Sequence, residues 1–193
     1  MRTIRNAAAL VLLGTLLSGA GNAGVFACSR SETPARTPDV PYEPSDPKVV
    51  DEMLRMANVG DQDLVYDLGC GDGRIVIAAV KRFGARGVCV DIDPVRIRES
   101  RTNAERAGVA DRIEFRTQDL FQTEIANATA VMLFLWPEVN LELKPRLLRE
   151  LAPGTRIVSH MHDMGNWKPD GYRTVDVAGR PHEIFLWVTP ERK

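Results

Sequence analysis

Residues 67–74 read Asp-Leu-Gly-Cys-Gly-Asp-Gly-Arg, and this stretch decides the fold. It follows the apolar run Leu64–Leu68 and precedes the helical pattern Arg74–Phe83, so it joins a predicted strand to a predicted helix. Glycines at such a junction let the backbone turn tightly and let a ligand approach without a Cβ in the way. Because open α/β sheets bind ligands outside the carboxyl ends of their strands, this loop predicts a binding site.

The chain around this loop alternates short apolar runs with helical patterns. We expect helices at 49–57, 74–83, 94–107 and 139–151, strands at 64–68, 87–91, 112–116, 130–135 and 156–160, and a closing pair of strands at 172–177 and 183–188. Such alternation predicts an α/β fold with a mostly parallel seven-stranded sheet and helices on both faces. The last two strands have no helix between them, so we expect an antiparallel closing strand.

Composition limits the class of protein. Of the 193 residues, 44% are hydrophobic and 26% are charged, which suits one globular domain. The net charge of -1 shows no basic excess, so we expect no nucleic-acid partner. The three cysteines, Cys28, Cys70 and Cys89, fit neither a disulfide framework nor a zinc site. We interpret Cys70 and Cys89 as buried or loop thiols.

The N-terminus is a separate segment. Arginines precede an uncharged stretch whose small residues end at Ala27, which is typical of a secretory signal peptide. Cys28 directly after it resembles a bacterial lipoprotein signal, and the uncharged stretch is also long enough for a membrane anchor. We expect a signal peptide, lipoprotein signal or membrane anchor at 1–28, a Pro-rich linker at 29–40 and the domain at 41–193. We therefore expect an exported or membrane-associated protein, which is periplasmic, lipidated or anchored. If the segment is an anchor, the domain can also lie on the cytosolic face of the membrane.

The glycine loop differs from the known nucleotide-binding motifs, and these differences indicate which ligand it binds. Arg74 or Val76 stands where the dinucleotide fingerprint needs its third glycine, and no Walker A sequence is present. Asp67 would repel a pyrophosphate, whereas it suits a ligand that bears ammonium and sulfonium groups. Asp91 closes the second predicted strand, where a carboxylate accepts hydrogen bonds from ribose hydroxyls. Asp119 follows the third strand and can meet an adenine edge.

With these residues the sequence resembles class I S-adenosylmethionine (SAM)-dependent methyltransferases, from about Pro41 to Trp187. The resemblance implies a Rossmann-like fold and SAM as the cofactor. It places Asp67 and Gly69 against the methionine part of SAM, Gly71 under the ligand, Asp91 on the ribose and Asp119 by the adenine. Asp93, next to Pro94, is expected to cap a helix instead.

Other stretches resemble a narrower group. Pro-Tyr-Glu-Pro at 41–44, Phe-Leu-Trp-Pro-Glu at 134–138 and Trp-Lys-Pro at 167–169 are similar to the group of lysine N-methyltransferases that act on the c-subunit of ATP synthase, and to its bacterial relatives. The sequence departs from that group at 91–93, where Asp-Ile-Asp replaces a Glu-Leu-Asn type of sequence. The resemblance implies methyl transfer to protein lysine and association with a membrane.

The sequence offers several candidates for the catalytic base and does not choose among them. Methyl transfer from a sulfonium needs no metal, but a lysine amine must first lose a proton to a carboxylate, a histidine or water. The candidates are Glu138 and His160, followed by His162 and Asp163. Glu138 also suits the N-terminal charge of a helix, and His160 also suits a hydrogen-bonded position at a strand end.

Two functions are compatible with these residues. The first is a SAM-dependent methyltransferase that acts on a protein or small-molecule acceptor. The alternative is an exported SAM-fold binding module with weak or no catalysis, since SAM is made in the cytosol and the N-terminus predicts export. Either is compatible with membrane association through the N-terminus. Retention of Asp67, Gly69, Gly71 and Asp91 favours the enzyme.

Overall fold

The structure, a computed structural model, describes residues 41–191. The helices are Pro47–Met56 (α1), Arg74–Phe83 (α2), Pro94–Ala107 (α3) and Pro137–Glu150 (α4), with a 3-10 turn at Ala110–Arg112 (η1). The strands are Leu64–Leu68 (β1), Arg86–Asp91 (β2), Ile113–Thr117 (β3), Ala130–Leu133 (β4), Arg156–His160 (β5), Gly171–Val177 (β6) and Arg180–Val188 (β7). The predicted N-terminal signal or anchor and the linker lie outside the described residues. Among residues 41–191, no helix is both long and apolar enough to cross a bilayer.

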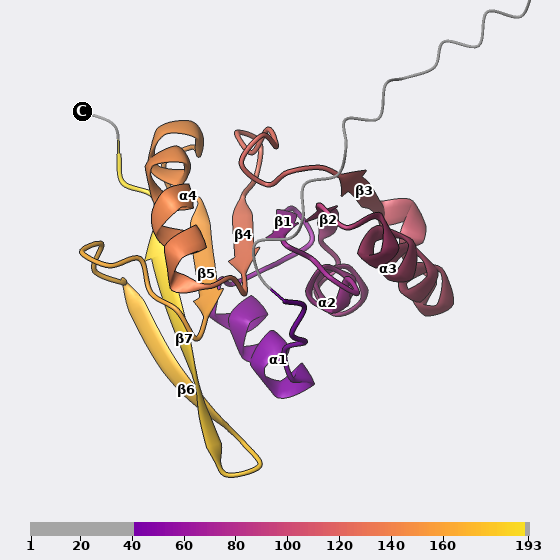
Figure 1. The fold of residues 1–193 in the computed structure, drawn as a ribbon, viewed down its shortest axis with the longest axis horizontal. Helices are drawn as coiled ribbons and strands as arrows, with labels where there is room; N and C mark the ends of the chain where they lie inside the picture. The colour runs from indigo at the N-terminus through magenta and orange to yellow at the C-terminus, as the bar shows by residue number, and fades with distance from the viewer. Residues whose placement is uncertain (1–40, 192–193) are drawn as a thin grey trace, which may run out of the picture. The chain divides into compact units, whose positions relative to one another are not determined.

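The seven strands form one sheet with the order β3-β2-β1-β4-β5-β7-β6 (Figure 1). β1 pairs in parallel with β2 and β4, and further parallel pairs join β2 to β3 and β4 to β5. β7 pairs antiparallel with both β5 and β6, so it alone runs against the other strands. The predicted mostly parallel sheet with an antiparallel closing strand is confirmed. Its carboxyl edge gathers the loops after β1, β2, β4 and β5.

Local signals explain where the helices begin. Asp46 accepts a hydrogen bond from the backbone N–H of Lys48, and Pro47 occupies the first turn of α1. Asp93 caps α3 in the same way, as predicted. α2 differs, because its N-cap is Gly73 in the left-handed region and provides no side-chain cap. The backbone N–H groups at the N-terminus of α2 therefore depend on the residues of the glycine loop for hydrogen-bond partners.

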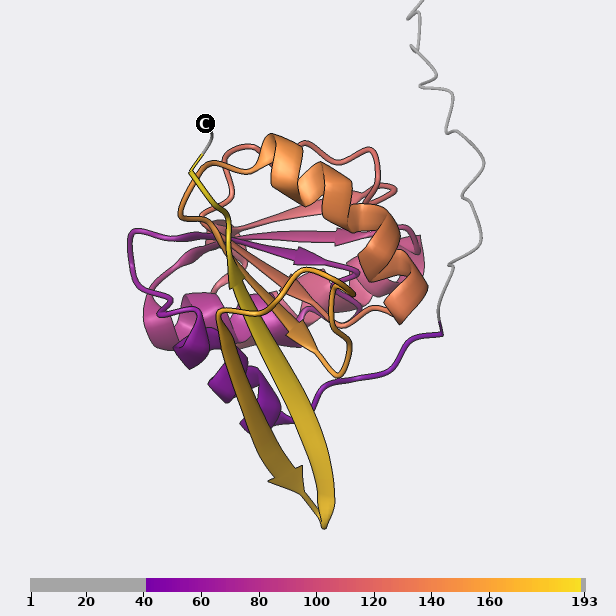
Figure 2. The same ribbon diagram turned by 90° about the vertical axis from the view of Figure 1, so that its left-hand side faces the viewer.

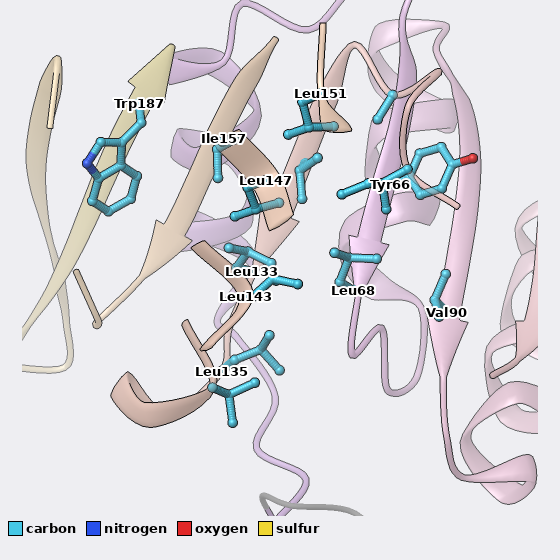
Figure 3. Packing of buried hydrophobic residues seen from close by; sticks show 14 of the residues in the cluster. Tyr66, Leu68, Val90, Leu133, Leu135, Leu143, Leu147, Leu151, Ile157 and Trp187 are labelled. Atoms are coloured by element: carbon cyan, nitrogen blue, oxygen red, sulfur yellow. The ribbon is translucent and has the colours of Figure 1, made fainter. Parts of the chain in front are cut away.

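Helices cover both faces of the sheet (Figure 2). α1, α2 and α3 pack on one face, where Val49, Met53 and Ala79 bury apolar surface against the strands. α4 covers the other face, and its Leu143 and Leu147, together with its C-cap residue Leu151, pack among the strand residues (Figure 3). Burial of an aliphatic side chain of this size contributes about 1.5–3 kcal/mol, so this packing holds α4 over β4 and β5.

Most element boundaries differ from the sequence-based expectation by one or two residues, and the differences at β4 and β7 change the description of the fold. β4 ends at Leu133 rather than at Leu135, because the chain turns towards α4, whose first residue is Pro137. Phe134 and Leu135 therefore leave the sheet and line a cavity. The closing hairpin is longer than expected, since β7 begins at Arg180. Its two-residue turn has positive φ at both positions, which matches the twist of the strands.

The interpretation of Cys70 and Cys89 as free thiols is wrong. They form a disulfide, with 5.4 Å between their Cα atoms. Cys89 lies within β2, and the loop after β1 folds back over that strand, where the backbone N–H of Cys70 donates to Val90 O at 2.9 Å. Spacing along the chain conceals this pairing, because only the parallel pairing of β1 with β2 brings the two residues together.

We expect Gly87→Ala to destabilise the protein. Gly87 lies in β2, and an added Cβ would stand 2.2 Å from Cγ2 of the buried Val76 in α2. Overpacking of this kind costs about 1–3 kcal/mol, and urea unfolding measures it. Gly60→Ala is the matched control, because its Cβ would meet nothing within 4 Å. Equal unfolding free energies for the two variants would contradict the packing of α2 on β2.

Candidate active site

A cavity of about 460 Å³ opens at the carboxyl edge of the sheet, beside the ends of β1, β2 and β4. Its volume falls in the range of small-molecule and cofactor sites. The five residues predicted to bind the cofactor all line it: Asp67, Gly69, Gly71, Asp91 and Asp119. The structure thus brings together residues that the sequence spreads over more than fifty positions.

The glycine loop needs its glycines for two separate reasons. Gly69 and Gly71 have φ values of +81° and +53°, in the region that favours glycine. Each is also closely covered: a Cβ on Gly69 would lie 2.8 Å from Cδ2 of Leu135, and one on Gly71 would lie 2.5 Å from Cε2 of Tyr42. Side chains at these two positions would fill the floor of the cavity.

Asp91 ties the glycine loop to β2. One of its carboxylate oxygens accepts the backbone N–H of Gly71 and the other that of Asp93, both at 2.9 Å. Burial raises the pKa of Asp91, against the lowering effect of these two hydrogen bonds. The carboxylate therefore shapes the loop and also presents oxygen atoms to the cavity.

Asp67 is buried at the base of the cavity, where its side chain has only 2% relative exposure. Its Oδ2 has no hydrogen-bond partner among residues 41–191. Burial, together with repulsion from the nearby Asp72 and Asp91 carboxylates, raises the pKa of Asp67 to about 8. A buried carboxyl with a free oxygen is suited to a cationic ligand group, which would satisfy the oxygen and favour its ionised form.

Asp119 lies on the loop that follows β3. Its Oδ1 accepts the backbone N–H of Phe121 at 2.9 Å, which closes a local turn. Asp119 and the neighbouring Leu120 both line the cavity, on the side of β2 and β3. The carboxyl of Asp67 suits the cationic end of SAM, Asp91 and Asp119 suit its ribose and adenine, and the glycine floor lies between them.

A short segment in front of α1, residues 41–46, lies over the cavity, and we call it the strap. Tyr42 covers Gly71, and the guanidinium of Arg96 lies 4.5 Å from the centre of the Tyr42 ring. Arg74 pairs with Asp72 at 2.6 Å and donates from Nη1 to the carbonyl oxygen of Ser45 at 2.8 Å. Sequence reasoning used Arg74 only to exclude a dinucleotide, although this residue joins the strap to the glycine loop.

The far end of the cavity is walled by apolar side chains from the β4–α4 junction: Phe134, Leu135 and Val139. Behind this wall the ring of Phe134 lies 4.0 Å from that of His160, centre to centre. His160 is fully buried, and its Nδ1 lies 3.0 Å from Oγ of Ser45, which lines the cavity. The next residue, Met161, has a φ of 66°, and such strained backbone is concentrated at functional sites.

The other candidate bases lie elsewhere. Glu138 is exposed in the first turn of α4 and does not line the cavity. His162 and Asp163 lie in the turn after β5, where Asp163 accepts the backbone N–H of Gly165 at 2.8 Å. His160 is the candidate whose hydrogen bonds reach the cavity, through Ser45. Ser45 was not among the predicted site residues, because a serine directly in front of a helix is typical of a helix cap.

Comparisons with known proteins agree with this geometry. The sequence of residues 67–171, more than half of the chain, matches the family model of the ANTKMT methyltransferase domain. The chain belongs to this methyltransferase family. A protein-lysine N-methyltransferase of Saccharolobus islandicus is 45% identical over 157 residues, which cover 81% of this chain and 98% of the relative. The lysine N-methyltransferase of Homo sapiens that is named for the C-subunit of ATP synthase is 32% identical over 162 residues, covering 81% and 69%.

A solved structure extends the likeness to the cofactor. An RNA methyltransferase from Salinibacter ruber in complex with S-adenosyl-L-homocysteine is 50% identical, with a TM-score of 0.73 over 78% of this chain and 96% of that one. The protein is thus a class I SAM-dependent methyltransferase of the predicted family, with SAM as its cofactor. Nothing in these comparisons supports the alternative of an exported binding module.

Proposed function

We propose that this methyltransferase transfers the methyl group of SAM to the side-chain amine of lysine in a protein. The observation that carries the proposal is the 45% identity to a protein-lysine N-methyltransferase, which extends over 98% of that relative's length. A relative that is 32% identical is also named for lysine N-methylation. The acceptor is accordingly a protein.

The shape of the cavity supports a lysine acceptor. SAM, when bound, supplies an electrophilic methyl group, and the acceptor must bring a nitrogen lone pair towards it. Phe134, Leu135 and Val139 form an apolar wall that suits the aliphatic stem of lysine, which buries its methylenes and keeps its charged end on polar groups. Ser45 is the polar side chain beside this wall that could receive an amine hydrogen.

Product analysis tests the proposal. The full chain is incubated with SAM that carries a deuterated methyl group, together with a bacterial protein extract, and the proteins are digested for mass spectrometry. We expect deuteromethyl groups on lysine Nε. The same extract with its lysines acetylated beforehand is the control, and it should take up no label.

The name of the Salinibacter ruber relative makes RNA the second candidate acceptor. The chain has a net charge of -1, so its composition lacks the basic excess that is typical of nucleic-acid-binding proteins. Bacterial RNA is therefore incubated in parallel, and its nucleosides are analysed for the same label. Label on RNA with none on lysine would overturn the proposed function.

A further inference from the structure

Three side chains from distant parts of the sequence form a chain of hydrogen bonds. Ser45 Oγ lies 3.0 Å from Nδ1 of His160, and Nε2 of His160 lies 2.8 Å from Nδ1 of His182. Ser45 belongs to the strap, His160 ends β5 and His182 lies near the start of β7. The two imidazole rings are stacked, with 5.1 Å between their centres.

This chain of hydrogen bonds leads from the cavity towards solvent. Ser45 lines the cavity, His160 is fully buried and His182 is half-buried on the β6–β7 hairpin. The hairpin reaches past the carboxyl edge of the sheet, because the residues of β7 before Ile184 lie beyond the last residue of β5 (Figure 2). Within residues 41–191, no group of three or more histidine, cysteine or acidic side chains could hold a metal ion.

We propose that Ser45, His160 and His182 form a proton relay that deprotonates the acceptor amine, a role that rests on the proposed lysine methylation. The ammonium gives a proton to Ser45 Oγ while the hydroxyl hydrogen moves to Nδ1 of His160. The hydrogen on Nε2 of His160 passes to Nδ1 of His182, which then releases a proton from Nε2 to solvent. The amine nitrogen keeps the electron pair with which it attacks the methyl group.

The surroundings of His160 suit a group that passes a proton without keeping it. Burial, together with the neighbouring His182 and His162, lowers the pKa of His160 to about 4. The titratable groups that face it are these two histidines, while Ser45 and the ring of Phe134 cover its other sides. Both ring nitrogens of a neutral His160 are engaged in the chain, one as acceptor and one as donor. The proton is therefore passed on to the more exposed His182 and from there to solvent.

The relay is tested with Ser45→Ala and His182→Gln in the full chain. Glutamine at 182 keeps an oxygen that can accept the Nε2–H of His160, yet it cannot take up the proton, so this variant preserves the hydrogen bond and breaks the relay. Initial rates of deuteromethyl-lysine formation are measured at saturating SAM with the bacterial protein extract. SAM affinity is measured separately by calorimetry, and we expect it to stay within about twofold of the wild type.

At pH 7 we expect both variants to be slowed at least about tenfold, since general acid–base groups contribute factors of 10² or more. Their deficit should shrink towards pH 9.5, because the neutral fraction of a lysine with a pKa near 10.4 rises about tenfold per pH unit. A merely structural role would lower the rate by the same factor at every pH. Arg180→Gln is the matched control, since Arg180 is exposed on β7 two residues from His182 but outside the chain of hydrogen bonds, and its rate profile should follow the wild type.

A deficit that does not change with pH, or a His182→Gln variant as fast as the wild type, would overturn the relay while lysine methylation stands. Absence of methyl-lysine from the wild-type reaction would instead overturn the proposed function, and the relay with it. A readout independent of activity is the imidazole Nε2–H of His160 in NMR spectra. We expect it to exchange slowly in the wild type and in His182→Gln and to exchange fast in His182→Ala; fast exchange in the wild type would show that the chain is not formed.

Discussion

Binding of SAM at pH 7 should release about one proton from the wild-type protein and none from an Asp67→Asn variant. Asp67 has a pKa of about 8 in the free protein, because burial disfavours its charged form and Asp72 and Asp91 repel it. It is therefore mostly protonated at pH 7. The cationic groups of SAM would favour the carboxylate and displace the proton. Calorimetry in two buffers of different ionisation enthalpy measures the number of protons released.

The same substitution should stabilise the free protein at alkaline pH. The folded pKa of Asp67 lies above its unfolded value of 3.8, so the folded state holds an extra proton between about pH 4 and pH 8. The unfolding free energy of the wild type then falls as pH rises through this window, by at most about 1.4 kcal/mol per pH unit. Asparagine does not ionise, so Asp67→Asn should be the more stable protein at pH 8, and its advantage should grow across this window by at most about 1.4 kcal/mol per pH unit.

Asp67→Asn should bind SAM more weakly than the wild type, although the free variant is the more stable protein. An asparagine at this position would offer no negative charge to the ligand, and loss of a hydrogen bond to a charged group costs about 1.5–3 kcal/mol, or roughly a 10- to 150-fold weaker complex. Asp111→Asn is the control, because Asp111 is exposed on η1 and away from the cavity. Proton uptake, or no net exchange of protons, on binding to the wild type would contradict a protonated Asp67 in the free protein.

The second large effect is expected for Asp91→Ala, which should weaken SAM binding by about 100-fold or more. Two backbone donors, the N–H groups of Gly71 and Asp93, lose their acceptor in this variant. The cavity loses a carboxylate as well, so the substitution removes both a ligand contact and the support of the loop. Each lost charge-assisted hydrogen bond costs about 1.5–3 kcal/mol. Calorimetric titration with SAM measures the affinity.

Asp91→Asn separates the two roles of this residue. Its side-chain oxygen can still accept one backbone N–H, whereas its amide nitrogen cannot accept the other. We expect an affinity between those of the wild type and Asp91→Ala. Circular dichroism confirms that each variant is folded before titration. Wild-type affinity in a folded Asp91→Ala variant would show that SAM does not use this end of β2.

Local sequence signals specified much of this protein. An apolar run before glycines and a helical pattern after them predicted β1, the loop and α2, because strand and helix periodicity and the freedom of glycine act within a few residues. Asp93 before Pro94 predicted the start of α3 for the same reason. The carboxyl ends of parallel strands meet at one edge, so Asp67, Asp91 and Asp119 could be assigned to one site from their places alone.

Contacts between distant segments required the tertiary structure. The Cys70–Cys89 disulfide exists because the loop after β1 folds over β2, and no spacing rule for cysteines describes that geometry. Ser45 and His160 are 115 positions apart, and they meet because Arg74 holds the strap while β5 ends beneath it. The sequence by itself determined the element types and the cofactor edge, since these depend on local patterns. Only the packing of the sheet, strap and hairpin decided which polar groups lie within hydrogen-bonding distance of one another beside the cavity, because those distances depend on the whole fold.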